Sequence, residues 1–155
     1  MRVHSPPHVA AGSLVHSPAD LSQVGGEVVL GRVADTLEGG REAARSLLST
    51  GFDPTAIICV NDITAVGALR ELRERGLRVP QDISVTGFDN VKLAEFCQPA
   101  LTTVHIPRNR IGHIICSRLL PGDTEEESSN LEIVIDPELV VRESTGPAPS
   151  RRGGH

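Results

Sequence analysis

Two short polar clusters in this sequence have the side chains needed to bind a small molecule. Asn61 and Asp62 directly follow the apolar run "AIICV". Asp89 and Asn90 directly follow a second run, "ISVTGF". A carboxylate accepts hydrogen bonds from two hydroxyl groups, and an amide both donates and accepts. The clusters are therefore suited to grip a neutral, hydroxyl-rich molecule, although the same residue types also serve only to cap helices and turns.

The two apolar runs are expected to be parallel strands that position these clusters. The run 56–60 is short, uninterrupted by polar residues and rich in β-branched side chains, which is typical of a strand covered on both faces of a sheet. Residues 83–88 are expected to form the next strand. The helix between them is capped by Asn61 or Asp62 and ends at Gly76. In an open α/β sheet ligands bind outside the carboxyl ends of the strands, where both clusters lie.

Further strands and helices alternate along the chain and predict an α/β fold with a parallel sheet. The first helix is capped by Asp35 or Thr36, with Glu38 placed to complete a capping box from Asp35, and it ends at Gly51. "KLAEFCQ" allows at most two helical turns. The other expected elements are strands at 27–31, 101–106, 131–135 and 138–142, and a helix from Pro107 to about Leu120.

Length and charge limit the classes of protein to which this chain can belong. The 155 residues suffice for one domain, with residues 1–26 as an irregular or disordered lead, 27–145 as the ordered part and 146–155 as a flexible tail. A net charge of -5 and the absence of Trp and Tyr argue against a nucleic-acid reader. No segment resembles a secretion signal or a bilayer span, so we expect a cytoplasmic protein without membrane contact.

The sequence favours neither an enzyme nor a metal protein. Asp89 with His105 or His113 would allow acid–base chemistry, but no nucleophile elbow, P-loop or GxGxxG motif accompanies them. His4 and His8 have helical spacing that two prolines interrupt. We therefore predict no catalytic residue, no metal site and no cofactor.

A long ordered motif resembles a known family. The pattern "ND..A.GALR.L.E.G..VP.DISV.GFD", followed by "P.LTTV", is similar to the carboxyl-terminal half of the effector-binding domain of LacI/GalR-type transcriptional regulators. The likeness extends upstream through "DTLEGGREAARSLL" and downstream through "PELVVRES", from about Gly31 to Ser144.

The resemblance implies a periplasmic-binding-protein-like fold, mainly its carboxyl-terminal subdomain. It implies that residues 27–145 bind a small effector such as a sugar, a nucleobase or a related metabolite. The family's effector contacts carry over to Asn61 and Asp89. Residues of about 101–120 would form the strand and helix that cross to the other subdomain.

Departures from the family pattern qualify these expectations. Asp35 stands where relatives commonly place an aromatic residue that stacks on the ligand, and Arg108 lies near another position that lines the pocket in some relatives; both are weaker candidates for effector binding. The helix-turn-helix and the amino-terminal subdomain have no counterpart in this sequence, so operator DNA would be bound only through a region absent from this chain.

The resemblance also implies a partner and leaves one alternative. We expect a homodimer through the helix after "LEGG" and the region of Leu93, Phe96 and Cys97. A fragment of a periplasmic sugar-binding protein of a transporter would share the fold, but that class requires an export signal.

Overall fold

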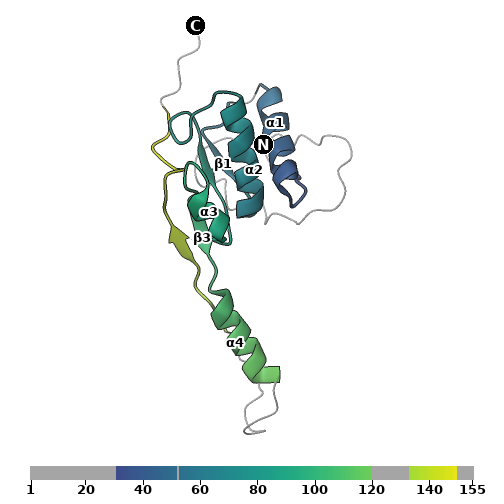
Figure 1. The fold of residues 1–155 in the computed structure, drawn as a ribbon, viewed down its shortest axis with the longest axis vertical. Coiled ribbons are helices and arrows are strands. Elements are labelled where there is room, and N and C mark those ends of the chain that lie inside the picture. Colours follow the sequence, from purple (N-terminus) through teal and green to yellow (C-terminus); the bar gives the residue numbers. More distant parts are fainter. Residues whose placement is uncertain (1–30, 52, 120–132, 150–155) are drawn as a thin grey trace.

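The computed structural model describes residues 31–51, 53–119 and 133–149. Strands β1 (Ala56–Ile58) and β2 (Ser84–Thr86) are parallel, with Ala56 opposite Ser84, as predicted. Helices α1 (Leu37–Ser49) and α2 (Asp62–Glu74) pack side by side next to this sheet (Figure 1). The order strand, helix, parallel strand confirms the α/β class.

The apolar core lies between α2 and β2. Small and aliphatic side chains from α2, β2 and the two segments after β2 fill it, and all are buried: Ala65, Leu69, Leu72, Ile83, Val85, Ala94 and Leu101. The side chain of Leu72 completes the inward face of α2, and the side chain of Arg73 is exposed. Burial of the aliphatic face of α2 is the main source of its stability, because isolated helices of this length are marginal in water.

The ends of α1 and α2 follow from local sequence. Thr36 caps α1 by accepting a hydrogen bond from the amide of Gly39 at 2.9 Å. Gly51 and Gly76 follow the last turns of α1 and α2 with φ of 76° and 74°, in the left-handed region that glycine adopts without steric cost. The predicted stops at both glycines are confirmed.

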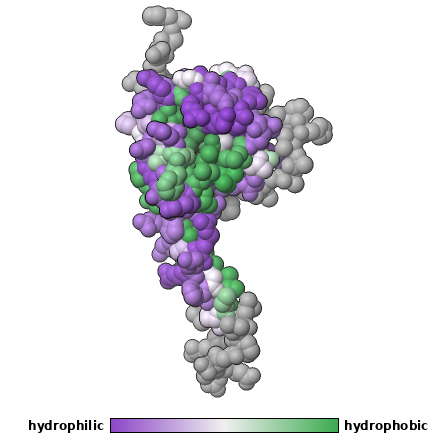
Figure 2. Space-filling model, viewed as in Figure 1, coloured by the Kyte–Doolittle hydropathy of each residue, from purple (hydrophilic) through white to green (hydrophobic). Residues whose placement is uncertain are grey.

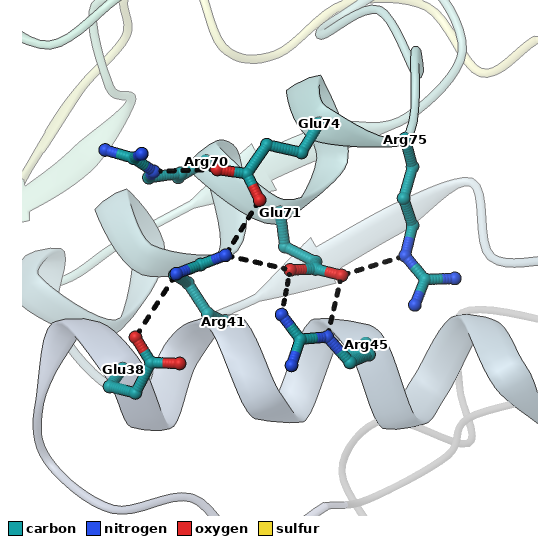
Figure 3. Close-up of polar contacts among 7 residues, drawn as sticks. All are labelled: Glu38, Arg41, Arg45, Arg70, Glu71, Glu74 and Arg75. Atoms are coloured by element: carbon teal, nitrogen blue, oxygen red, sulfur yellow. Dashed lines mark hydrogen bonds and ion pairs between the residues drawn. The ribbon is translucent and has the colours of Figure 1, made fainter.

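Charged side chains join α1 to α2 along the exposed side of their contact. The Glu71 carboxylate is only 5% exposed and lies among Arg41, Arg45 and Arg75, at 3.7, 2.9 and 2.9 Å (Figure 3). Hydrogen bonds from Arg45 and then Arg75 lower the pKa of Glu71 to about 2. Close helix packing beneath this cluster requires glycine, because a Cβ on Gly67 would overlap the carbonyl oxygen of Leu37.

A second part of the structure leads away from the core. The short helix α3 (Lys92–Phe96) precedes β3 (Thr103–His105), which pairs antiparallel with β4 (Glu138–Val140). Isolated bridges, Thr86 to Thr102 and Asp89 to His105, place β3 beside β2. Helix α4 (Arg108–Leu119) directly follows Pro107 and projects from the body (Figure 1). A strand and a helix are thus present where both were predicted, and their crossing to another subdomain stays a prediction.

Three predictions about the elements are wrong. The run 56–60 forms a strand only to Ile58, and that side chain is 76% exposed because the face of β1 that carries Ala56 and Ile58 is not covered within the described residues. Thr36 caps α1, so the capping box from Asp35 to Glu38 does not form, and Glu38 pairs with Arg41 instead. Residues 133–135 are not a strand, because β4 takes β3 as its partner.

Several expectations concern residues outside the described ranges. These are the lead at 1–26, most of the strand at 27–31 and the start of the strand at 131–135. At the other end, the amide of Gly146 donates to the Ser84 hydroxyl at 3.2 Å, so the first residue of the expected tail contacts β2.

Candidate functional site

Asn61 sits at the carboxyl end of β1 and caps α2. Its side-chain oxygen accepts from the amide and the hydroxyl of Thr64, at 2.9 and 3.0 Å. The backbone of Asn61 is extended (φ -156°), as an N-cap requires. Of the two predicted caps, Asn61 is the one observed. Capping therefore uses the oxygen of this amide, while its nitrogen donates a hydrogen bond to Asp35.

Asp62 has a different role from the cap that the sequence suggested. The side chain is completely buried, and its two oxygens accept from the Thr103 hydroxyl at 2.5 Å and from the Val91 amide at 2.7 Å. Its backbone amide donates to the carbonyl of Phe88 at 2.9 Å. Asp62 thus ties the turn after β1 to the turn after β2 and to β3.

Asp89 lies in the turn at the carboxyl end of β2 and has an unusual backbone. Asp89 and Asn90 have φ of 105° and 50°; positive φ is uncommon outside glycine, although Asn and Asp adopt it more often than other residues. The amide of Asp89 donates to the carbonyl of Val104 at 2.9 Å, and the Val91 amide is held by the buried Asp62. Backbone strain at a turn persists only where its surroundings enforce it, and these bonds supply that restraint.

Arg142 and His105 complete the restraint, and the sequence reasoning did not assign them this role. Arg142 donates to the Asn90 side-chain oxygen at 2.8 Å, and the Asn90 amide nitrogen faces His105 Nδ1 at 3.3 Å. A guanidinium can only donate, so Arg142 determines which end of the Asn90 amide faces the histidine. The only sequence signal for Arg142 is its place in "PELVVRES".

The Asp89 carboxylate has an exposed cation beside it. Arg108, at the start of α4, places a guanidinium nitrogen 3.6 Å from Asp89 Oδ1, and the two side chains are 53% and 38% exposed. Burial raises the pKa of the Asp89 carboxyl, Arg108 opposes this, and the negative charges of Asp62 and Asp35 add to the rise. At neutral pH an accessible carboxylate at this position can accept hydrogen bonds from a ligand.

Asp35 forms the second pair at this edge. Its carboxylate accepts a hydrogen bond from the Asn61 side-chain nitrogen, and it is exposed just before α1. The structure therefore gathers all four predicted residues at the carboxyl edge of the sheet as two pairs, Asp35 with Asn61 and Asp89 with Arg108. The Asp62 amide bond to Phe88 connects the two turns that carry them.

A separate apolar groove lies between α1, α2 and α3. Its volume is about 320 Å³, and its apolar lining includes Leu37, Val66, Leu69, Leu93 and Cys97. Figure 2 shows apolar side chains, in green, gathered on this face of the molecule. Phe96, on α3 beside the groove, is also exposed. This surface is distinct from the polar edge that carries Asp89.

The described residues have neither a cluster of metal ligands nor a membrane-spanning helix. Across residues 31–51, 53–119 and 133–149, His, Cys, Asp and Glu side chains nowhere gather in threes in a way that could hold a metal ion. No helix in that part of the chain has the length and apolar character needed to cross a bilayer.

Comparisons with known proteins give a consistent relationship. A family model described as a periplasmic binding protein-like domain matches residues 18–145. The HTH-type transcriptional regulator MalR of Streptomyces coelicolor is 46% identical over 118 residues, which are 76% of this chain and 34% of that protein. The chain thus spans about a third of the length of the curated relatives that it matches.

Solved structures agree with the sequence relationship. A LacI family transcriptional regulator from Arthrobacter sp. FB24, in complex with lactose, superimposes with a TM-score of 0.70 at 29% identity, over 83% of this chain and 49% of that one. The transcriptional regulator CelR in complex with cellobiose gives 0.69 at 31% identity, over 81% and 39%. The chain belongs to the periplasmic binding protein-like domain family, in the form found in the effector-binding domains of LacI-type transcriptional regulators.

Proposed function

We propose that this chain binds a sugar or sugar-like effector at the carboxyl edge of β1 and β2, as the effector-sensing part of a LacI-type regulator. The observation that carries the proposal is the Asp89 carboxylate. It is accessible, it follows a core strand, and its turn is restrained in a rare conformation by Asp62 and Arg142 through neighbouring residues. Such preorganisation lowers the cost of ordering the site when a ligand binds.

Two structural relatives support the chemical class of the effector. One was solved with lactose and the other with cellobiose, both rich in hydroxyl groups. A carboxylate and an amide nitrogen at the edge match such ligands, because Asp89 accepts from adjacent hydroxyls and Asn61 retains a donor.

Binding of DNA is expected of another part of the regulator. The curated relatives are named HTH-type regulators, and the matched segment covers 34% of the MalR relative. With a net charge of -5, this chain should bind operator DNA weakly at about 150 mM salt. A regulator of this kind acts in the cytoplasm, and effector binding would shift its DNA affinity by about 1 to 3 kcal/mol.

A homodimer through the apolar groove is the second part of the proposal. The groove lining and the exposed Phe96 supply contiguous apolar surface on α1, α2 and α3, which a two-fold related copy would bury. Sedimentation of the chain at tens of micromolar should show a dimer, and Leu93→Glu should convert it to a monomer. A wild-type chain that sediments as a monomer would contradict the proposed dimer and leave the proposed effector site unaffected.

The effector site is tested by calorimetric titration of the chain with lactose and with cellobiose. Hydrogen bonds to a charged group contribute about 1.5 to 3 kcal/mol each, so Asp89→Asn should weaken binding by about ten-fold to a thousand-fold. Asp53→Asn, the same change at an exposed position away from the edge, is the control and should bind normally. Equal affinity of Asp89→Asn and wild type for whichever sugar binds would show that Asp89 only shapes its turn.

A further inference from the structure

The proposed effector site offers a ligand fewer hydrogen-bond donors than acceptors. Asn61 uses its side-chain oxygen for the amide of Thr64, and the Thr64 hydroxyl lies 3.0 Å from both this oxygen and the backbone carbonyl oxygen of Asn61. One hydrogen of its nitrogen is directed to Asp35. An amide has two lone pairs and two hydrogens, so Asn61 retains a single N–H and at most one lone pair for a ligand.

Acceptors at the same edge carry negative charge. Asp35 uses one oxygen for Asn61, and within the described residues its second oxygen makes no hydrogen bond. Asp89 faces Arg108 at 3.6 Å, which is an ion pair longer than a hydrogen bond, and it therefore keeps acceptor capacity. Asp35 contacts Asn61, and the backbone bond from Asp62 to Phe88 joins the turn of Asn61 to the turn of Asp89, so the two carboxylates lie at the same edge. The charge of Asp35 makes the smallest of the contributions that raise the pKa of Asp89.

Among residues 31–51, 53–119 and 133–149, Arg108 is the one cation that forms an ion pair with either carboxylate. Arg108 is more than half exposed, so water screens its charge, and a flexible side chain at the start of α4 can move away from Asp89. The buried Asp62 carboxylate adds a further negative charge close to Asp89. A ligand at this edge thus meets an excess of negatively charged acceptors and few donors.

We propose that Asp35 determines the charge class of the effector: the site takes neutral or amino-substituted polyhydroxylated ligands and excludes sugars that carry a carboxylate or a phosphate. This inference rests on the proposed function and adds a selectivity to it. Hydroxyl and ammonium groups supply the donors that Asp35 and Asp89 lack, and an ammonium forms the stronger, charge-assisted bond. An anionic substituent would meet like charge that the site cannot neutralise.

Three disaccharides with the same β-1,4 linkage test this selectivity. Cellobiose is neutral, the corresponding glucosamine dimer carries ammonium groups, and glucuronosyl-glucose carries a carboxylate. Titration calorimetry with the chain at low salt should show the glucosamine dimer binding at least about ten-fold more tightly than the glucuronosyl compound, with cellobiose between them. The ratio should shrink as salt is raised, since screening weakens charge at exposed sites.

The Asp35→Asn variant tests the contribution of Asp35 to this selectivity independently of the other residues of the site. The variant keeps the size of the side chain and an oxygen for Asn61 but removes the charge, so it should fold normally and reduce the ratio by about ten-fold. Asp53→Asn removes one charge elsewhere and should leave the ratio unchanged.

The remaining outcomes distinguish the two proposals. If cellobiose binds through Asp89 but the three ligands bind equally, or Asp35→Asn keeps the wild-type ratio, the inference is wrong and the proposed function stands. If none of the three ligands, nor lactose, binds the chain, the sugar-binding function fails and the selectivity fails with it.

Discussion

Replacement of Asp62 by Asn tests the connection between the two turns of the site. In the structure the Asp62 carboxylate is completely buried and accepts from the Thr103 hydroxyl and the Val91 amide. An Asn side chain of the same shape has one oxygen, so it preserves one of these bonds and replaces the other by a weaker or mismatched contact.

The expected loss follows from the number and type of bonds. A hydrogen bond to a charged group contributes about 1.5 to 3 kcal/mol, and one such bond is lost in Asp62→Asn. We therefore expect the free energy of unfolding to fall by about 1.5 to 3 kcal/mol. If Asp62 only capped α2, its replacement by the equally good cap Asn would cost almost nothing.

Urea unfolding followed by circular dichroism at the helix band is the appropriate assay, because the sequence has no Trp or Tyr to report by fluorescence. Asp53→Asn is the matched control at an exposed position and should change stability by no more than about 0.5 kcal/mol. A loss below about 0.5 kcal/mol for Asp62→Asn would refute the assigned role of the buried carboxylate.

Two further predictions concern the packing of α1 on α2. Gly67→Ala should destabilise the chain by about 1 to 3 kcal/mol, because the new Cβ overlaps the Leu37 carbonyl. Gly112→Ala in α4, where the space around the new Cβ is open, should not destabilise the chain. Thermal melts of both variants compare their stabilities directly. The pKa of Glu71 in the folded chain is about 2, below the ordinary glutamate value of 4.5. Its contribution to stability is therefore present above pH 4.5 and is lost as the pH falls toward 2. Glu71→Gln should therefore be less stable than wild type at pH 6, with the difference diminishing toward pH 2, and a constant difference across this window would contradict the assignment.

Local sequence determined the elements whose signals lie within a few residues. Helix caps, glycine stops and the aliphatic face of α2 depend on contacts between near neighbours or on a 3.6-residue repeat. The glycine stops of α1 and α2 and the strand-helix-strand order were predicted correctly for this reason, whereas each N-cap was left open between two residues. The position of Asn61 and Asp89 at one sheet edge followed as well, since parallel strands must align their carboxyl ends.

Tertiary structure alone decided the roles of the residues at that edge. Asn61 and Asp62 are equally plausible caps by type, and only the positions of Val91 and Thr103, far along the chain, make Asp62 a buried acceptor. Arg142 reaches Asn90 from 52 residues away, and the exposure of Ile58 depends on which segments cover its face of β1. Sequence patterns report residue type and local periodicity, whereas these roles depend on distances between segments that meet only in the folded chain.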